Sequence, residues 1–290
     1  EIYTLSLHDA LPIFGRTRTR NAFECGITQL GGHANYLTPK ATQVGHGESP
    51  KDTIEVLGRM GHGIGVRNTL VDGHCWMEDL AKYARIPVMN MQCDIWHPTQ
   101  ALADIMTIKE KFHDELRGRK FVISWTCAGQ YMRPLSMANS LVTLMPRFGL
   151  DVTLAHPKGF ELDPKIMEIA RANADAAGSK FELVHDMEEA CTGADIIYAK
   201  GWGPIMTVGD DEARGLAMIN EHPDWFVDQR KMDLGSKDAI YMHCMPADRD
   251  IEVTSEVLDG PRSVIYDEAE NRLHTIKALM ALTMGNINRR

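Results

Sequence analysis

Apolar residues along the chain occur in two alternating patterns. Short runs of β-branched and other apolar residues predict strands, whereas apolar residues spaced three and four apart predict helices with one buried face. From about residue 17 onward the two kinds of segment alternate, which is typical of an α/β protein with parallel sheets. We predict strands at residues 34–37, 64–66, 88–91, 121–125, 151–155, 181–185, 196–199, 240–242 and 264–266.

Helices are predicted between these strands. Proline at position 98 suits the first turn of a helix that continues to about residue 112. The last helix, residues 268–284, places Leu273, Ile276 and Met280 on one face. The predicted helices are residues 20–30, 51–60, 77–83, 98–112, 164–177 and 268–284.

The length of the chain and a polar connecting segment predict two domains, each built on a doubly wound parallel sheet. A chain of 290 residues suits two domains, and the polar segment 116–120 separates the two series of strands. The boundary is therefore expected near residue 116. Residues 1–15 start without Met and lack the basic start and cleavage site of a signal peptide, so we expect a non-native leader there.

Charge and cysteine content exclude several classes of protein. The 31 basic and 40 acidic residues give a net charge of −9, which argues against nucleic acid or an anionic membrane surface as a partner held by bulk electrostatics. No apolar run approaches the length of a membrane span. The six cysteines have no CxxC spacing, which indicates a reducing compartment such as the cytoplasm.

Residues 17–20 read Thr-Arg-Thr-Arg and precede a helical run. Hydroxyls, guanidiniums and free backbone N–H groups at a helix N-terminus are the parts of a phosphate site. Residues 97–100 read His-Pro-Thr-Gln and follow a strand, at the end where α/β proteins place ligand groups. Arg67 also lies at a strand end. Taken singly, these segments also suit an exposed basic turn or a helix cap.

Residues 241–246 read Tyr-Met-His-Cys-Met-Pro and end another strand. The pair His243 and Cys244 suggests a nucleophile, but adjacent side chains in an extended segment point to opposite faces. No His or Cys spacing predicts a zinc site, so we expect no metal. Residues 267–274 place acids in the first turn of the last helix and Arg272 one turn in, which a solvated helix start also explains.

Together, the segments TRTR, HPTQ, HCMP and ENRLH, in this order at strand-to-helix junctions, resemble the aspartate/ornithine carbamoyltransferase superfamily over residues 16–285. The resemblance implies a carbamoyl-phosphate domain made of residues 16–115 and 268–290, and an amino-substrate domain of residues 116–267. It also implies a homotrimer without a cofactor, acting on carbamoyl phosphate and a small amine.

The resemblance also implies roles for single residues. The catalytic residues would be Arg18, Thr19, Arg67 and His97, which stabilise the oxyanion and the leaving phosphate. Arg20 would be structural, and His46 would lie on a loop that reaches the neighbouring subunit. The residues expected to bind carbamoyl phosphate are Thr17, Arg18, Thr19, Arg67, His97, Gln100, Cys244, Met245 and Arg272.

Some residues differ from the family pattern in the segments that bind the amino substrate. Ornithine enzymes carry Asp in a DxWxSMG motif, but residues 199–203 here read Ala-Lys-Gly-Trp-Gly. This segment, with residues 133–136 and 153–157, resembles the knotted carbamoyltransferases, which implies a deep trefoil knot in the second domain. Cys93 stands where the acetylornithine enzymes have Glu, which favours a YgeW-like group of unsettled substrate. The expected amino-substrate contacts are Cys93, Lys200, Trp202, Cys244 and Met245.

Other functions stay open at this point. Within the family, the alternatives are an N-acetylornithine, N-succinylornithine or ornithine carbamoyltransferase. A dinucleotide-dependent dehydrogenase would need G-x-G-x-x-G after a strand, whereas the glycines of residues 61–65 have another spacing and precede a strand. A non-catalytic paralogue is the third alternative, because Arg16 replaces the Ser of the family's phosphate-binding turn.

Overall fold

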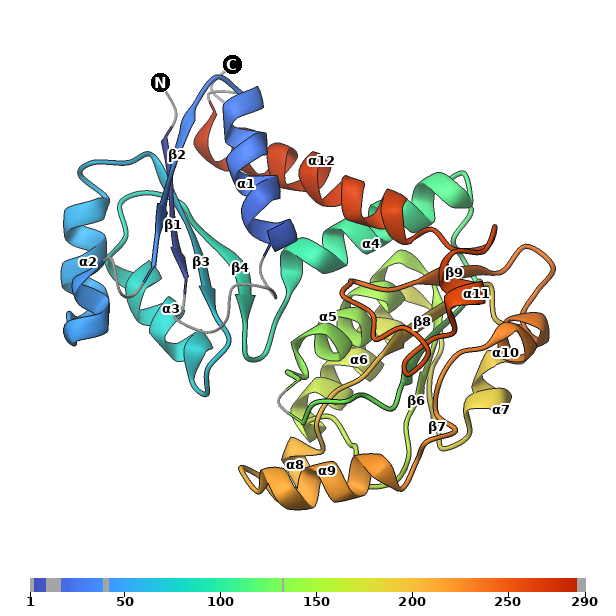
Figure 1. The fold of residues 1–290 in the computed structure, drawn as a ribbon. Helices are drawn as coiled ribbons and strands as arrows, with labels where there is room; N and C mark the ends of the chain where they lie inside the picture. Colours follow the sequence, from blue (N-terminus) through green and yellow to red (C-terminus); the bar gives the residue numbers. More distant parts are fainter. Residues whose placement is uncertain (1–2, 9–16, 39–41, 132, 286–290) are drawn as a thin grey trace. The chain divides into compact units, whose positions relative to one another are not determined.

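The computed structural model describes residues 3–8, 17–38, 42–131 and 133–285. The chain divides into two units, Glu1–Ala103 with Ala269–Arg290 and Asp104–Glu268. Each unit is built on a parallel sheet with helices on its faces (Figure 1), which confirms the predicted fold class. The division falls within the helix α4 (Pro98–Lys111), whereas the expected boundary near residue 116 follows that helix.

Unit 1 contains a parallel sheet in the order β2-β1-β3-β4. The strands are β1 (Tyr3–His8), β2 (His33–Leu37), β3 (Gly63–Asn68) and β4 (Val88–Cys93). β1 pairs with β2 and β3 and was not predicted, because residues 1–15 were set aside as a leader. Residues 1–2 and 9–16, including Arg16, lie outside the described residues.

Helices cover both faces of this sheet. One core, centred on Ile54 and Ile64, lies between the sheet and helices α2 and α3. The other, centred on Phe23 and Met280, lies between the sheet and helices α1 and α12, which run side by side in Figure 1. The helices of unit 1 are α1 (Thr17–Gln29), η2 (Gln43–His46), α2 (Pro50–Leu57), α3 (Gly73–Tyr83) and most of α12 (Ile265–Met284).

Unit 2 contains a parallel sheet in the order β7-β6-β5-β8-β9. Figure 1 shows α5 and α6 on one side of it and α7 and α10 on the other. The strands are β5 (Lys120–Trp125), β6 (Asp151–Ala155), β7 (Phe181–Val184), β8 (Ile196–Lys200) and β9 (Ile240–Met242). The helices are α5 (Ser136–Leu144), η3 (Met145–Phe148), α6 (Pro164–Ala177), α7 (Met187–Cys191), α8 (Ile205–Val208), α9 (Glu212–Asn220), α10 (Gln229–Leu234) and α11 (Ser255–Leu258).

The predicted strand at residues 264–266 is wrong, and the last helix begins at Ile265 rather than at residue 268. Ser263, directly before this segment, forms an isolated bridge to Tyr241 of β9. The run Val-Ile-Tyr favours a strand by propensity, but Asp267 follows at once and its negative charge stabilises a helix N-terminus. The trefoil knot stays a prediction.

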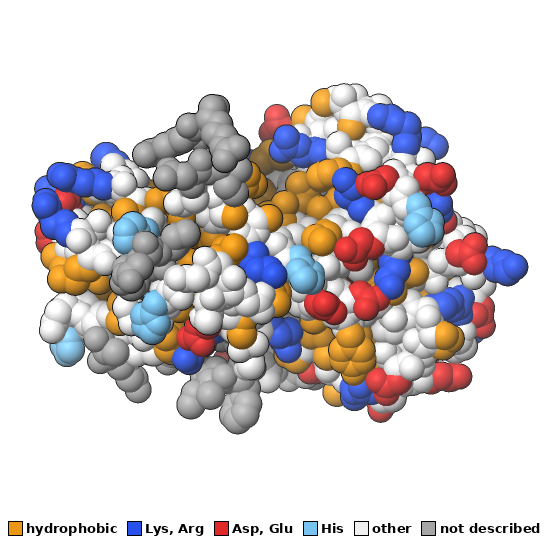
Figure 2. Space-filling view, turned by 90° about the horizontal axis from the view of Figure 1, so that it is seen from above, with side chains coloured by type: hydrophobic (Ala, Val, Ile, Leu, Met, Phe, Trp, Pro, Cys, Tyr) orange, Lys and Arg blue, Asp and Glu red, His pale blue; other side chains and the backbone are white. Residues whose placement is uncertain are grey.

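Charge is distributed rather than concentrated on the visible surface. Figure 2 shows Lys and Arg side chains interspersed with Asp and Glu over much of one face. Among the described residues, no helix combines the length and the apolar character that crossing a bilayer requires.

Candidate functional site

In unit 1, polar side chains from three distant segments meet. Arg272 of α12 donates to Oε1 of Gln100 at 2.7 Å and, from its other terminal nitrogen, to the hydroxyl of Thr19. All three residues are buried, with exposed fractions of 1% for Gln100 and 3% for Thr19 and Arg272. One guanidinium therefore joins α12 to the first turns of α1 and α4.

His97 immediately precedes α4 and is also buried. Burial lowers the pKa of its imidazole well below 6.5, and the positive charges of Arg272, Arg67 and Arg18 lower this pKa further. The ring is therefore neutral near pH 7 and carries one N–H donor. Three guanidiniums close to a neutral donor form a site suited to an anion with a neighbouring carbonyl oxygen.

The remaining residues of the TRTR segment differ in their surroundings. Thr17 is exposed at the start of α1. Arg20 pairs with Glu24 at 2.7 Å and lies 3.6 Å from the ring centroid of Tyr36 on β2. These two contacts give Arg20 a packing role between α1 and β2.

Three further expected residues are placed as follows. His46 is exposed at the end of η2. Cys93 is fully buried, and its sulfur accepts hydrogen bonds from Nδ2 of Asn90 at 3.4 Å and the backbone N–H of Trp96 at 3.2 Å. Trp202 is 1% exposed. Cys93 and Trp202 are thus buried side chains, and their expected contact with the amine stays a prediction.

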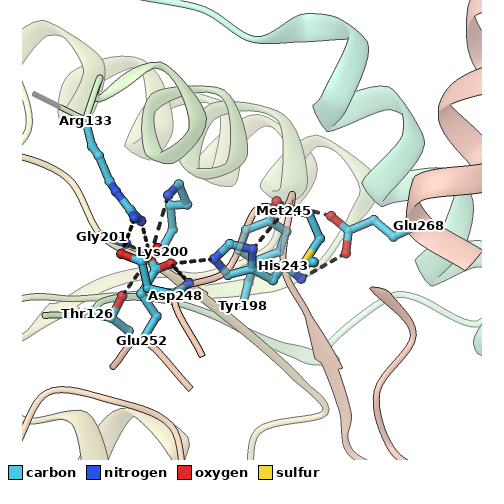
Figure 3. Close-up of polar contacts among 10 residues, drawn as sticks. All are labelled: Thr126, Arg133, Tyr198, Lys200, Gly201, His243, Met245, Asp248, Glu252 and Glu268. Carbon is cyan, nitrogen blue, oxygen red and sulfur yellow. Dashed lines mark hydrogen bonds and ion pairs between the residues drawn. The ribbon is translucent and has the colours of Figure 1, made fainter. Parts of the chain in front are cut away.

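In unit 2, a buried carboxylate lies among several basic side chains (Figure 3). Glu252 is 0% exposed and lies 2.6 Å from Arg133, 3.6 Å from Lys200 and 3.4 Å from Nε2 of His243. Burial opposes its ionisation, but the charge of Lys200, with His243 and Arg133, outweighs burial and holds the pKa of Glu252 far below its usual range. Glu252 is therefore ionised near neutral pH.

Backbone groups complete the surroundings of Glu252. Its oxygens accept from the N–H of Gly201 at 2.9 Å and of Asp248 at 2.8 Å. A Cβ at Gly201 would lie 2.6 Å from Cβ of Ala128, so only glycine brings this N–H so close. Asp248 in turn accepts from Arg133 at 2.5 Å. Arg133 is thus held between two carboxylates.

The HCMP segment follows β9. Burial raises the pKa of the Cys244 thiol, so the sulfur is protonated near neutral pH. Nδ1 of His243 accepts from the N–H of Met245 at 2.8 Å, and its Nε2 faces Glu252, so neither ring nitrogen is directed to Cys244. This geometry does not activate Cys244 as a nucleophile.

Sequence reasoning missed the roles of Glu252, Asp248 and Arg133 in unit 2. Glutamate is usually exposed, and nothing in the local pattern around Glu252 predicts its burial. The loop of residues 133–136 was noted only as a likeness to relatives. Among the described residues, no group of three or more His, Cys, Asp or Glu side chains is placed to hold a metal ion.

Two family models match the chain. Residues 15–110 match "Aspartate/ornithine carbamoyltransferase, carbamoyl-P binding domain", and residues 132–283 match "Aspartate/ornithine carbamoyltransferase, Asp/Orn binding domain". The first match contains Arg67 and His97, and the second contains Glu252 and Arg272.

Individual relatives are similar over most of their length. An ornithine carbamoyltransferase of Thermococcus kodakarensis is 42% identical over 271 residues, which are 93% of this chain and 81% of the relative. The solved ornithine carbamoyltransferase of Pyrococcus furiosus is 39% identical, with a TM-score of 0.86 over 99% of this chain and 86% of that one. A solved N-acetyl-L-ornithine transcarbamylase is 34% identical, with a TM-score of 0.88 over 97% of this chain and 89% of that one.

Proposed function

The chain belongs to the aspartate/ornithine carbamoyltransferase family, and on this premise we propose that it transfers the carbamoyl group of carbamoyl phosphate to the amino group of an amino-acid-like substrate. The observation that carries the proposal is the convergence of Thr19, His97, Gln100 and Arg272 in unit 1. Its donors and positive charges suit a phosphate joined to a carbonyl group.

The proposed mechanism follows from the types of residue. An unprotonated amine attacks the carbamoyl carbon, the carbonyl oxygen becomes an oxyanion, and the bond to phosphate breaks. The neutral ring of His97 donates its N–H to that oxygen, and Arg67 and Thr19 stabilise the same charge. Arg18 and Arg67 balance the charge of the departing phosphate. No covalent intermediate with the enzyme is needed.

We further propose that the substrate has a carboxylate and an uncharged α-nitrogen. Lys200 and Arg133 are the cations of unit 2 beside Glu252, with side chains 14% and 12% exposed. Arg133 is already paired with Glu252 and Asp248, whereas the contact of Lys200 with Glu252 is longer, so Lys200 is the cation that favours a substrate carboxylate and disfavours a nearby ammonium. An α-N-acylated diamino acid has the required charges, and N-acetyl-L-ornithine transcarbamylase is among the similar structures.

Ornithine is the second candidate, because the T. kodakarensis relative named an ornithine carbamoyltransferase is 42% identical. The side chain expected to hold the free α-ammonium is an aspartate, and Lys200 has the opposite charge. We therefore rank ornithine second. Membership in the knotted, YgeW-like group remains a prediction from Cys93 and from the segment that contains Lys200.

We also propose a homotrimer in which His46 reaches the site of a neighbouring subunit. The support is the family's trimeric rule together with the exposure of His46 at the end of η2. In this arrangement each site would need two chains.

A panel of amines tests the proposed function. The purified chain is incubated with carbamoyl phosphate and N-acetylornithine, N-succinylornithine, ornithine or a plain diamine, while phosphate release and product mass are followed. We expect faster phosphate release and a carbamoylated product with the acylated ornithines. Turnover of ornithine alone would select the second candidate, and no amine-dependent release with any member would refute the transferase proposal.

Two lysine variants test the charge argument. Lys200→Met should raise KM for the acylated substrate by about tenfold or more, because a hydrogen bond to a charged group is lost. Lys237→Met, at an exposed lysine of unit 2, is the matched control and should leave KM unchanged. Equal KM values for the two variants would remove Lys200 from the substrate site.

A further inference from the structure

His243 is anchored at three points although no step of the proposed mechanism uses it. The residue is 0% exposed. Its backbone N–H donates to Oε2 of Glu268 at 2.9 Å, its Nε2 lies 3.4 Å from Oε2 of Glu252, and its Nδ1 accepts from the N–H of Met245 at 2.8 Å (Figure 3). Two of these contacts orient the buried ring: the hydrogen bond at Nδ1 and the longer contact of Nε2 with the Glu252 carboxylate.

The same contacts determine where its proton lies. A backbone N–H can only donate, so Nδ1 of His243 must be the unprotonated nitrogen. In the neutral ring the proton is then on Nε2, which faces an ionised carboxylate that can only accept. Burial lowers the pKa of His243, which keeps the ring neutral near pH 7. Both neighbours therefore require the same tautomer.

The group that Nδ1 holds has an unfavourable backbone conformation. Met245 has a backbone φ of 54°. This value lies in the left-handed region, which residues other than Gly, Asn and Asp rarely adopt. Such a conformation persists only where the surroundings determine it. The hydrogen bond from Met245 to the buried ring of His243 supplies that constraint at this residue.

We propose that His243 is a positioning residue for amine binding. Glu252 keeps the proton of the ring on Nε2, and Nδ1 accepts a hydrogen bond from the amide of Met245. The turn of Cys244 and Met245 thereby keeps the shape that receives the amine. The inference rests on the proposed function and on the expected contact of Cys244 and Met245 with the amine. It adds His243 and Glu252 as the groups that set the shape of the turn. His243 itself does not contact the reacting atoms in this proposal.

Two substitutions test the roles of the two ring nitrogens separately. In His243→Asn, Oδ1 takes the place of Nδ1 and still accepts from Met245, but the contact with Glu252 is lost. In His243→Gln, the longer side chain reaches toward Glu252, but the acceptor at the position of Nδ1 is lost. Both variants remove the ring and leave a smaller amide, so they form a matched pair.

Steady-state kinetics give the first readout. We expect His243→Gln to raise KM for the amine by about tenfold, which corresponds to the free energy of one hydrogen bond. We expect His243→Asn to keep KM within about twofold of the wild type. The backbone hydrogen bond from His243 to Glu268 involves no ring atom, so both variants should retain it. Equal KM values for the two variants would overturn the positioning role.

Amide exchange gives a second readout that does not depend on activity. In protein labelled with [15N]methionine, the signal of Met245 is assigned by its absence in Met245→Leu. We expect slow exchange of this amide in the wild type and in His243→Asn, and fast exchange in His243→Gln. Fast exchange in the wild type would overturn the hydrogen bond and the inference, even if neither variant folds.

The two readouts also keep this inference apart from the proposed function. If the wild type carbamoylates no amine, the proposed function fails, and with it the link from the turn to an amine. If the wild type is active and His243→Gln loses protection of Met245 without any change in KM, only the positioning role fails.

Discussion

His97 shows how burial sets the chemistry of one side chain. Its pKa is lowered by burial and by three arginines, so the ring can donate a hydrogen bond without carrying a charge. We expect His97→Ala to lower kcat by at least about tenfold, because one oxyanion donor is lost. His33→Ala, at an exposed histidine of β2, is the control and should keep wild-type kcat. Unchanged kcat in His97→Ala would show that the donor lies elsewhere.

The same residue makes stability depend on pH. The folded pKa of His97 lies below 6.5, the unfolded value. As the pH falls below about 6.5, the unfolded chain therefore binds the proton first and the free energy of unfolding decreases. The slope is about 1.4 kcal/mol per pH unit for each such histidine.

This effect is measured by urea unfolding of the wild type and His97→Ala at pH 7.5 and 5.5. We expect the free energy of unfolding to fall more in the wild type than in the variant, because only the wild type buries this neutral ring. Other buried groups, among them Glu268 with its raised pKa, act equally in both proteins and cancel. An equal fall in the two proteins would mean that His97 titrates normally when folded.

Single residues differ in how far sequence can predict them. Thr19, Gln100 and Arg272 belong to short motifs at helix starts, and the structure brings them into hydrogen-bonding contact. Glu252 belongs to no such motif. Its importance comes from burial beside Arg133 and Lys200, which depends on tertiary packing that one sequence without a structure does not reveal.

At the scale of elements, periodicity predicted long segments well and short ones less well. The predicted helix 164–177 coincides with α6, where Asp163 caps the N-terminus and Gly178 ends the helix in a left-handed conformation. Residues 264–266 were misassigned because three residues of high β-propensity directly precede the acidic first turn of α12. β1 was missed because residues 1–15 were set aside as a leader.

The helix α12 offers a test of packing in unit 1. Ile276 is 1% exposed and belongs to the core shared with α1. We expect Ile276→Ala to lower the free energy of unfolding by about 2–5 kcal/mol, since it leaves a cavity. Leu282→Ala, at a residue of the same helix that is 57% exposed, is the matched control and should change little. Urea unfolding measures both, and equal values would show that α12 is not anchored by this face.

At the scale of the whole molecule, two helices pass from one unit to the other. α4 carries Gln100 in unit 1 and Asp104 in unit 2, while α12 carries Glu268 in unit 2 and Arg272 in unit 1. Burial, followed by the charge of Asp104 and a hydrogen bond that protonated Glu268 donates to Asp104, raises the pKa of Glu268. Each helix thus contributes polar groups to both units, and the buried acids lie close to the points where the helices change unit.

The proposed trimer predicts complementation between two impaired variants. If each site uses His97 of one chain and His46 of its neighbour, homotrimers of His97→Ala or of His46→Ala each have strongly reduced activity. In every mixed trimer, however, one site combines an intact His97 with an intact His46. Random reassembly should therefore restore about one quarter of wild-type activity, as expected for three equivalent interfaces. The measurement is carbamoyl transfer after the variants are unfolded and refolded together, with each variant refolded alone as the control. Activity no greater than the mean of those two controls would place His46 outside the site of any neighbour.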